Sequence, residues 1–309
     1  MNSAMVFPKT LKKGDTVGLV APASPIPKEN ISRCREVVES LGFKVIMGRS
    51  VDKSYLGYLS GDDDVRAGDM NEMFESKDID GIFCVRGGYG SCRIVDKLEL
   101  DIIRANPKVF VGYSDVTILH LVFNQICNMI TFHGPMVSSN MISEFDDYTR
   151  KSFMDTLLMQ RELEFQNPEN KRIMTLNEGY GNGALVGGNL CLLATSIGTS
   201  YELETKGKIL FLEELNEVTY KVDRLLQQLK HSGKLSEVKG IILGGFEKCN
   251  PEHEGDATLV EVFRDVIKPL NIPTVYNVEV GHGFPTASLP LGARCELDAT
   301  NGKIRFSRY

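Results

Sequence analysis

Short apolar runs alternate along the chain with segments whose apolar residues recur every three or four positions. Such runs are typical of buried strands, whereas the spacing of three and four residues is typical of one face of a helix. In the first half, the expected strands cover residues 16–22, 43–47, 81–85, 109–111 and 129–135, with expected helices at 28–41, 62–76 and 115–126 and another ending near 98. Strands that alternate with helices form parallel βαβ units, so the pattern predicts a doubly wound α/β fold.

The chain has 309 residues, which is long for a single hydrophobic core, and we therefore expect two domains. The first is expected at residues 1–138. Residues 139–178 are polar and irregular, and we interpret them as the connection. The second domain is expected at 179–309, with strands at 183–190, 208–212, 240–243, 274–280 and 295–298 and helices through 193, at 220–229 and at 258–267.

The composition argues against several classes of protein. The net charge of -6 is spread along the chain without a basic stripe, so nucleic acid is not an expected partner. The seven cysteines are scattered without a Cys-x-x-Cys pair, as in proteins that keep reduced thiols in a cytoplasm. We find no secretion signal, no apolar run of membrane-spanning length and no zinc-ligand spacing. We expect a cytoplasmic protein that needs no metal, cofactor or membrane.

One serine lies at the point where an apolar run changes into a helical pattern. Val109–Val111 is the run, Gly112 permits a turn, and the helical spacing begins after Ser114. Open α/β sheets bind ligands at such junctions between a strand's carboxyl end and a helix's amino end. Serine is also a preferred N-cap residue, and the surrounding sequence does not match the Gly-x-Ser-x-Gly form of a nucleophile elbow. Ser114 is therefore interpreted either as a reactive residue or as a helix cap.

Two acids and a histidine follow strands in the second half. Glu213 and Glu214 end its most apolar strand, and His282 lies between the next-to-last strand and a further apolar stretch. Serine, glutamate and histidine are the residue types of a nucleophile, an orienting acid and a general base. The acids are equally well explained as solvated loop residues, and His133, beside the strand of Ser114, is a rival base. Spacing alone leaves these alternatives open.

A glycine-dense turn, Arg86–Ser91, joins an expected strand to the next helix. Its glycines do not match the dinucleotide pattern Gly-x-Gly-x-x-Gly, and it lacks the Gly-Lys-Ser/Thr of a phosphate loop. The backbone N–H groups of such a turn can bind a carboxylate or a developing oxyanion. The alternative is a tight connection that binds nothing.

Several short segments are distinctive in both composition and order. They are Gly14–Ser24, Arg86–Gly90, Gly112–Asp115, His133–Pro135, Gly187–Leu190, Leu212–Glu214 with Asp223–Arg224, and Gly281–His282 with Leu289–Ala293. Together they span nearly the whole chain, and in this order they resemble the LD-carboxypeptidase family. That family of serine peptidases includes the muramoyltetrapeptide carboxypeptidases and the microcin C self-immunity peptidases.

The resemblance implies roles for individual residues. Ser114 corresponds to the family nucleophile and His282 to its general base. Glu213 corresponds to the acid, because the family motif is Leu-Glu followed by a second acid. The backbone N–H groups of Gly88 and Asp115 correspond to the donors that stabilise the oxyanion.

The resemblance also implies a fold, an assembly and a substrate. The N-terminal domain would contain a flavodoxin-like or amidotransferase-like parallel sheet, and the C-terminal domain, with the acid and the base, would be a swivelling β/α domain. The active site would lie in the cleft and the assembly would be a homodimer. The implied reaction cleaves a terminal D-alanine from an L-centre in cytoplasmic muropeptides during peptidoglycan recycling. Arg86 is our candidate for binding the terminal carboxylate.

Two other functions are kept as alternatives. The first is a microcin C-type immunity peptidase that hydrolyses peptidyl or aminoacyl-sulfamoyl adenylates. The absence of tryptophan and the chain length disfavour it, because that branch resembles longer chains that stack an aromatic ring on the nucleotide. The second is a non-enzymatic module that binds muropeptides, in which Ser114 only caps its helix.

Overall fold

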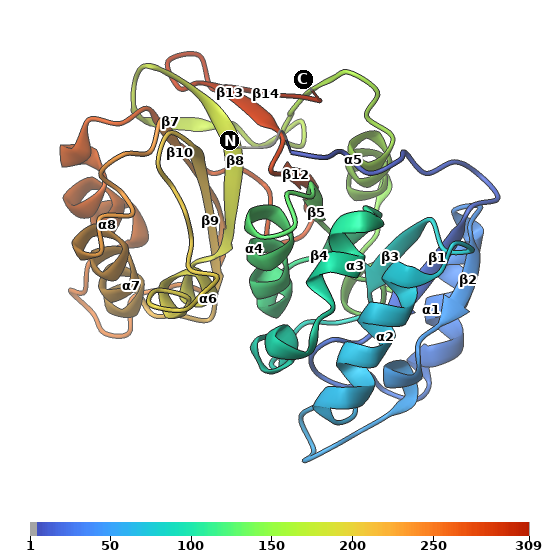
Figure 1. Cartoon of the computed structure of the whole chain (residues 1–309). Coiled ribbons are helices and arrows are strands. Elements are labelled where there is room, and N and C mark those ends of the chain that lie inside the picture. Colours follow the sequence, from blue (N-terminus) through green and yellow to red (C-terminus); the bar gives the residue numbers. More distant parts are fainter. Residues whose placement is uncertain (1–4, 309) are drawn as a thin grey trace. The chain divides into compact units, whose positions relative to one another are not determined.

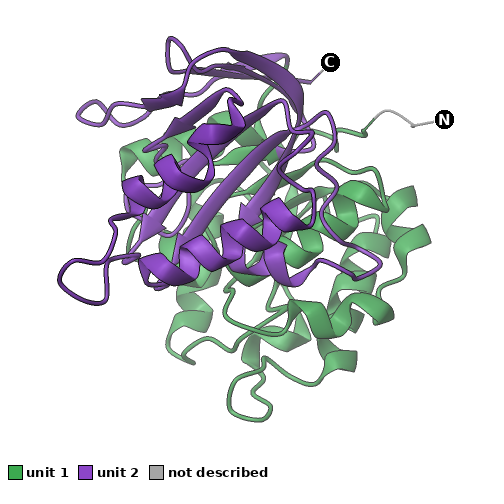
Figure 2. Cartoon of the chain, turned by 90° about the vertical axis from the view of Figure 1, so that its left-hand side faces the viewer, with its two compact units in different colours: residues 1–160, 288–290 green, residues 161–287, 291–309 purple. Residues whose placement is uncertain are grey.

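The computed structural model describes residues 5–308 and divides into two compact units. Unit 1 consists of Met1–Gln160 and Ser288–Pro290, and unit 2 consists of Arg161–Ala287 and Leu291–Tyr309. Figure 2 colours unit 1 green and unit 2 purple. Each unit has its own sheet, and each is described by itself below.

Unit 1 contains a six-stranded sheet in the order β12-β5-β4-β3-β1-β2 (Figure 1). The strands are β1 Thr16–Val20, β2 Lys44–Met47, β3 Gly81–Cys84, β4 Val109–Gly112, β5 Thr131–His133 and β12 Leu289–Leu291. The first five pair in parallel. Their order 2-1-3-4-5 is the flavodoxin-like order, in which ligands bind where the order reverses. The expected doubly wound parallel sheet is confirmed.

Aromatic contacts place helices on both faces of this sheet. Phe110 in β4 packs against Phe74 and Phe123, with ring centroids 6.4 and 4.9 Å away. Those two rings come from α2 (Asp63–Glu75) and α4 (Thr117–Gln125). Phe83 in β3 is one position out of register with Phe110 and therefore points to the other face. There its ring lies 5.5 Å from Phe153.

The remaining helical segments of unit 1 connect these strands. They are α1 Asn30–Ser40, α3 Leu100–Ala105, α5 Asp147–Leu157, the 3-10 helices η1 Arg49–Asp52, η2 Ser91–Lys97 and η3 Ser114–Val116, and the π-helical turn η4 Val137–Met141. The sequence pattern did not predict α5, which lies in the segment interpreted as a connection. Its buried residues are Thr149, Phe153, Thr156 and Leu157. Half of that stripe is threonine, so apolar periodicity did not reveal it.

Unit 2 contains an eight-stranded sheet in the order β6-β14-β13-β8-β9-β10-β11-β7. The strands are β6 Glu162–Glu164, β7 Met174–Asn177, β8 Tyr180–Asn189, β9 Ile209–Leu215, β10 Gly240–Glu247, β11 Thr274–Tyr276, β13 Arg294–Asp298 and β14 Lys303–Ser307. β8, β9, β10 and β11 are parallel, and the strands outside them pair antiparallel. The carboxyl ends of the four parallel strands therefore share one edge.

Three helices of unit 2 lie in front of its strands in Figure 2. They are α6 Leu190–Thr195, α7 Thr219–His231 and α8 Leu259–Val266, and α7 contacts both others. The strand expected at 274–280 is shorter than predicted and ends at Tyr276, because Asn277 adopts a left-handed φ of 60°. No helix within residues 5–308 has the length and hydropathy needed to cross a membrane.

Candidate active site

Ser114 lies on a strained turn between β4 and α4. Its φ is 63°, in the left-handed region that costs a non-glycine residue about 1–2 kcal/mol. The N-cap position of α4 is occupied by Val116, and Ser114 is the first residue of η3. Ser114 is thus not the cap of this helix, and the alternative interpretation is wrong. Strain of this kind is concentrated at functional sites in proteins.

Two glycines permit close packing at the turn that contains Ser114. A Cβ atom on Gly112 would lie 2.8 Å from Val116 Cγ1, which is too close for a real side chain. A Cβ on Gly87 would lie 3.1 Å from the Cβ and 3.3 Å from the Oγ of Ser114. The glycine-rich turn Arg86–Ser91 therefore lies directly against the serine.

The same turn is bound to the loop that follows β1. Gly88 has a φ of 104°, and a Cβ there would lie 2.3 Å from Ser24 Oγ. The backbone N–H of Tyr89 donates to Ser24 Oγ at 3.1 Å, and the N–H of Ser24 donates to Gly87 O at 3.1 Å. These contacts fix the backbone direction on both sides of Gly88.

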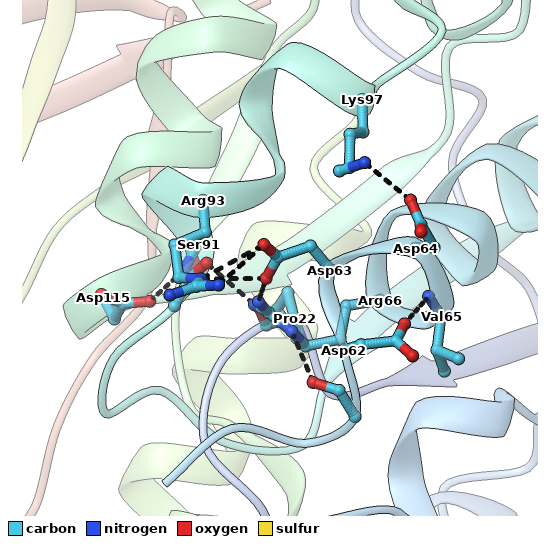
Figure 3. A network of polar contacts seen from close by, with 12 residues as sticks. Pro22, Asp62, Asp63, Asp64, Val65, Arg66, Ser91, Arg93, Lys97 and Asp115 are labelled. Carbon is cyan, nitrogen blue, oxygen red and sulfur yellow. Dashed lines mark hydrogen bonds and ion pairs between the residues drawn. The ribbon is translucent and has the colours of Figure 1, made fainter. Parts of the chain in front are cut away.

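Arg66 in α2 forms hydrogen bonds and an ion pair that connect it to several loops, and Figure 3 shows it with Pro22 and Asp63. Its side chain is fully buried, and Nη1 donates to Pro22 O at 2.5 Å and to Gly90 O at 2.8 Å. Nε donates to Gly61 O at 3.2 Å, and the guanidinium forms an ion pair with Asp63. Asp63 also receives a hydrogen bond from Arg93, which is partly exposed. Arg66 thus acts as a structural clamp that links the glycine-rich turn to the loops at Pro22 and Gly61.

Asp115 connects this clamp to the serine turn. Its buried carboxylate accepts a hydrogen bond from the N–H of Ser91 at 2.8 Å, one residue after the carbonyl that Arg66 holds. Burial raises the pKa of Asp115, while the hydrogen bonds from Ser91 and the charge of Arg66 oppose the rise. The two backbone segments that contain Gly88 and Asp115 are therefore joined through Ser91.

His120 supports the serine turn from α4. Its ring is fully buried, with Nε2 2.8 Å from Gly112 O and Nδ1 2.8 Å from Thr131 Oγ1. Burial lowers the pKa of His120 to about 4, so the ring is neutral at neutral pH. A carbonyl oxygen can only accept, so the proton is assigned to Nε2. The imidazole thereby anchors the carbonyl two residues before Ser114.

Two further residues named from the sequence also lie in unit 1. Arg86 is exposed, and its Nη1 donates to Pro25 O at 2.7 Å. His133, the rival base, is buried at the end of β5, where its ring packs 5.5 Å from Tyr113 and 6.5 Å from His120.

Unit 2 brings Glu213 and His282 together. Glu213 lies near the end of β9 and is fully buried, and its Oε2 is 2.6 Å from His282 Nδ1. The other carboxylate oxygen, Oε1, is buried and makes no hydrogen bond within the described part of the chain. A Cβ on Gly281 would lie 2.9 Å from Glu213 Oε2, and its φ of 132° also favours glycine. The residue before His282 must therefore be small for this pair to form.

The charge of Glu213 controls the titration of His282. Burial lowers the pKa of His282, but the charge and hydrogen bond of Glu213 outweigh it and raise the pKa above the usual 6.5. A carboxylate can only accept, so Nδ1 carries the proton toward Glu213. In the neutral ring this leaves the lone pair on Nε2, the arrangement of a general base oriented by an acid.

Glu214 has a different environment, although it is the next residue. Its carboxylate accepts hydrogen bonds from Asn189 Nδ2 at 2.8 Å, Cys191 N at 2.7 Å and Leu215 N at 2.8 Å. Burial raises the pKa of Glu214, and these bonds oppose the rise. Glu214 thus ties the end of β9 to the start of α6, while Glu213 is the acid that contacts histidine.

The predicted residues therefore fall into two groups. Ser114, Gly88, Asp115 and Arg86 belong to unit 1, and the pair Glu213–His282 belongs to unit 2. Sequence reasoning missed Arg66, because arginine in an amphipathic pattern is normally a solvated residue and nothing in the spacing marks it as buried. The role of the complete set of residues stays a prediction.

Two family models match this chain over most of its length. Residues 17–134 match the LD-carboxypeptidase N-terminal domain and residues 182–297 match the LD-carboxypeptidase C-terminal domain. A probable murein peptide carboxypeptidase of Bacillus subtilis is 38% identical over 294 residues, which cover 94% of this chain and 91% of that protein.

Two solved structures have the same fold. A muramoyltetrapeptide carboxypeptidase from Oxalobacter formigenes aligns with a TM-score of 0.85 and 27% identity, covering 94% of this chain and 98% of that one. MccF in complex with glutamyl sulfamoyl guanosine aligns with a TM-score of 0.88 and 27% identity, covering 98% of each chain. Other structures describe MccF as a microcin C7 self-immunity protein.

Proposed function

Because this chain belongs to the LD-carboxypeptidase family and is a serine-type carboxypeptidase, we propose that it releases the terminal D-alanine of muropeptides from an L-centre. Membership of this peptidase family rules out the non-enzymatic binding module considered from the sequence. The substrate is the finer part of the proposal, and the names of the murein and muramoyltetrapeptide carboxypeptidases similar to this chain support it.

The observation that carries the proposal is the Glu213–His282 hydrogen bond of 2.6 Å. A fully buried carboxylate that bonds Nδ1 fixes both the tautomer and the orientation of the imidazole. We assign the nucleophile to Ser114, whose positive φ and contact with the glycine-rich turn are features of a reactive serine at a strand-to-helix turn.

The proposed reaction has two stages. His282 Nε2 accepts the Ser114 proton as Oγ attacks the scissile carbonyl, and the N–H groups of Gly88 and Asp115 stabilise the oxyanion. The proton then passes to the leaving amine, D-alanine departs, and an ester on Ser114 remains. Water, deprotonated by His282, hydrolyses the ester, and the shortened peptide leaves. Catalysis in this scheme requires His282 Nε2 to lie within hydrogen-bond reach of Ser114 Oγ in the reacting complex.

We also propose domain limits, an oligomeric state and a cellular role for this protein. We place the nucleophile in an N-terminal domain at 1–138 and the acid and base in a C-terminal domain at 179–309. The two family matches, 17–134 and 182–297, fall inside these limits, which supports them. We further propose a homodimer that acts on cytoplasmic muropeptides during peptidoglycan recycling, with Arg86 as the candidate that binds the terminal carboxylate.

The direct test is to incubate the protein with a muramoyl tetrapeptide and measure free D-alanine by mass spectrometry. We expect release by the wild type and none by Ser114→Ala, with an unchanged melting temperature. A peptide whose scissile bond links two D-centres is the control and should remain intact. A fully active Ser114→Ala protein would contradict the assignment of the nucleophile.

The similarity to MccF supports a second candidate function, hydrolysis of aminoacyl-sulfamoyl nucleosides. The absence of tryptophan from this chain argues against it, because no indole is available to stack on a nucleobase. Side-by-side turnover of a muropeptide and an aspartyl sulfamoyl adenosine separates the two. Preference for the nucleoside by kcat/KM would overturn the muropeptide proposal.

A further inference from the structure

His282, the general base of the proposed mechanism, lies in a short loop of unit 2 that covers residues 281–286. Gly281 and Thr286 at the two ends of this loop are buried, whereas residues 282–285 between them are partly or largely exposed. An exposed segment packs against few neighbours, so its conformation depends on how its buried ends are held. The contacts at the two ends therefore determine the direction in which His282 projects.

One hydroxyl group joins the two ends of the loop. Thr286 is buried, and its Oγ1 accepts a hydrogen bond from the N–H of Gly281 at 3.1 Å. The same hydroxyl donates to Gly281 O at 3.1 Å. A threonine hydroxyl has one proton and two acceptor lone pairs, so it can serve both backbone groups at once. Thr286 thus closes the loop by binding both polar groups of the Gly281 main chain.

These two hydrogen bonds fix the peptide planes on both sides of the Gly281 Cα atom. The carbonyl of Gly281 belongs to the planar peptide unit that ends at the Cα of His282, so the bond from Thr286 sets the plane from which the histidine begins. The N–H of Gly281 belongs to the preceding unit. The other end of that unit, Val280 O, accepts from the N–H of Gly245 in β10 at 2.7 Å.

Gly281 does not hold this conformation by its own preference. Its φ is 132°, and glycine adopts a wide range of backbone angles at little cost. A residue with a Cβ is excluded, because that atom would lie 2.9 Å from Glu213 Oε2 and 3.0 Å from Glu213 Cβ. The main chain at Gly281 therefore packs directly on the acid, while hydrogen bonds from outside, two of them to Thr286, define its angles.

We propose that Thr286 is a positioning residue whose hydroxyl orients the peptide bond before His282, so that Nδ1 meets Glu213 and Nε2 is presented for proton transfer. The inference rests on the proposed mechanism, in which His282 is the base. The contact that depends on Thr286 is the 2.6 Å hydrogen bond between Glu213 Oε2 and His282 Nδ1. Thr286 acts through His282 and takes no part in the proton transfer itself.

Substitutions at position 286 separate the hydroxyl from the shape of the side chain. Thr286→Val keeps the shape but removes the acceptor of the buried Gly281 N–H, whereas Thr286→Ser keeps the hydroxyl. In Thr286→Val we expect kcat to fall about tenfold to 10²-fold with KM within about twofold of the wild type, because a small displacement of a catalytic group costs rate more than binding. Thr286→Ser should restore kcat to within about threefold of the wild type.

The pH profile reports on His282 itself. Burial lowers the pKa of His282, and the charge and hydrogen bond of Glu213 outweigh burial and raise it. Glu214 and Glu247 also raise this pKa, through charge alone. None of these acids is changed in Thr286→Val, but an imidazole that turns away from Glu213 loses its nearest negative charge. The acid limb of the kcat/KM profile should therefore move to lower pH in Thr286→Val and return in Thr286→Ser.

The proton on His282 Nδ1 gives a spectroscopic signature of the same contact. In the wild type it should produce a downfield NMR signal, which is assigned by its loss in His282→Ala. The signal should weaken or disappear in Thr286→Val and return in Thr286→Ser, because a shorter and better aligned hydrogen bond to a carboxylate is also a stronger one. This measurement needs no substrate.

Thr274→Val is the matched control in the same unit. Thr274 is buried in β11, and its Oγ1 donates to Ile272 O at 2.7 Å. This variant also loses a buried hydroxyl but lies outside the loop, so its kcat, acid limb and NMR signal should match the wild type. If Thr286→Val does not fold, Thr286→Ala and Thr286→Ser provide the same comparison, since both lack the methyl group and only the second has a hydroxyl.

The outcomes separate this inference from the proposed function. Wild-type kcat, acid limb and NMR signal in Thr286→Val would overturn the role of Thr286. So would a loss of kcat that Thr286→Ser shares, or one that leaves the NMR signal unchanged. If the wild type released no D-alanine, the proposed function would fail, and the NMR signals of Thr286→Val and Thr286→Ser would still decide whether Thr286 positions His282.

Discussion

The two units prepare their parts of the candidate site by different physical means. Unit 1 positions main-chain groups: glycines permit close approach around Ser114, and the buried Arg66 holds the carbonyls on which the turn depends. Unit 2 positions a side chain, because one buried carboxylate holds the ring of His282 through a single short bond. The backbone arrangement around Ser114 depends on shape and many weak contacts, whereas the orientation of His282 depends on the charge of Glu213. Their responses to mutation and pH should therefore differ.

The largest expected effect on activity comes from removing the negative charge of Glu213. Glu213→Gln should lower kcat about 10³- to 10⁴-fold, because an amide can donate to Nδ1 and so favour the wrong tautomer. The neighbouring substitution Glu214→Gln should instead lower the melting temperature, since Glu214 accepts three hydrogen bonds that hold α6 to β9. Steady-state kinetics and thermal melts of both variants provide the comparison. Equal losses of activity in the two variants would remove the distinction between these acids.

A smaller loss of activity is expected from removing the buried Arg66 side chain of unit 1. Arg66→Met leaves the carbonyls of Pro22, Gly61 and Gly90 without their donor and should cost about 3 kcal/mol in the free energy of unfolding. At temperatures where the variant is folded, kcat should fall up to about 10²-fold with little change in KM, because the proposed oxyanion donors would be displaced.

Arg93→Met is the matched control for that experiment. It removes the exposed partner of Asp63 and leaves the buried clamp in place, so stability and kcat should hardly change. Urea titrations measure the free energy of unfolding of both variants, and steady-state kinetics measure their kcat. Full activity in folded Arg66→Met would show that the clamp serves only stability.

The smallest expected effect is on stability, because His282 in unit 2 and His120 in unit 1 should respond to pH in opposite directions. The folded pKa of His282 is raised, so its contribution to stability is present below pH 6.5 and is lost as pH rises through the folded value. The folded pKa of His120 is lowered to about 4, so its contribution is present above pH 6.5 and is lost as pH falls toward 4.

Activity should follow only the histidine of unit 2. The acid limb of the kcat/KM profile should have its midpoint above pH 6.5, because the protonated form of His282 is not a base. In Glu213→Gln the charge that raises this pKa is gone, and the midpoint of the residual activity should move to lower pH. An unshifted profile would mean that another group controls the limb.

Much of the fold was predictable from the sequence. Parallel strands buried on both faces appear as continuous apolar runs, which is why β3 and β4 were located correctly. The choice between Glu213 and Glu214 was not predictable from pattern, since consecutive residues on a strand point to opposite faces. The family resemblance named Glu213, and the structure places it against His282 while Glu214 faces α6.

Other features could not be anticipated because they depend on tertiary contacts. The burial of Arg66 depends on carbonyls of two loops distant in sequence, at Pro22 and Gly90, and no local pattern records them. The positive φ of Ser114 likewise occurs where Gly87 of another loop packs against it, and it contradicts the cap that local propensity favours.

We propose that Ser114 is a nucleophile activated by a histidine that Glu213 orients. Labelling with a serine-directed fluorophosphonate, followed by peptide mapping, measures this directly. We expect a single adduct on Ser114 in the wild type, with labelling slowed at least about 10²-fold in His282→Ala and in Glu213→Gln. Labelling of a different serine, or equal rates in the wild type and His282→Ala, would contradict the account.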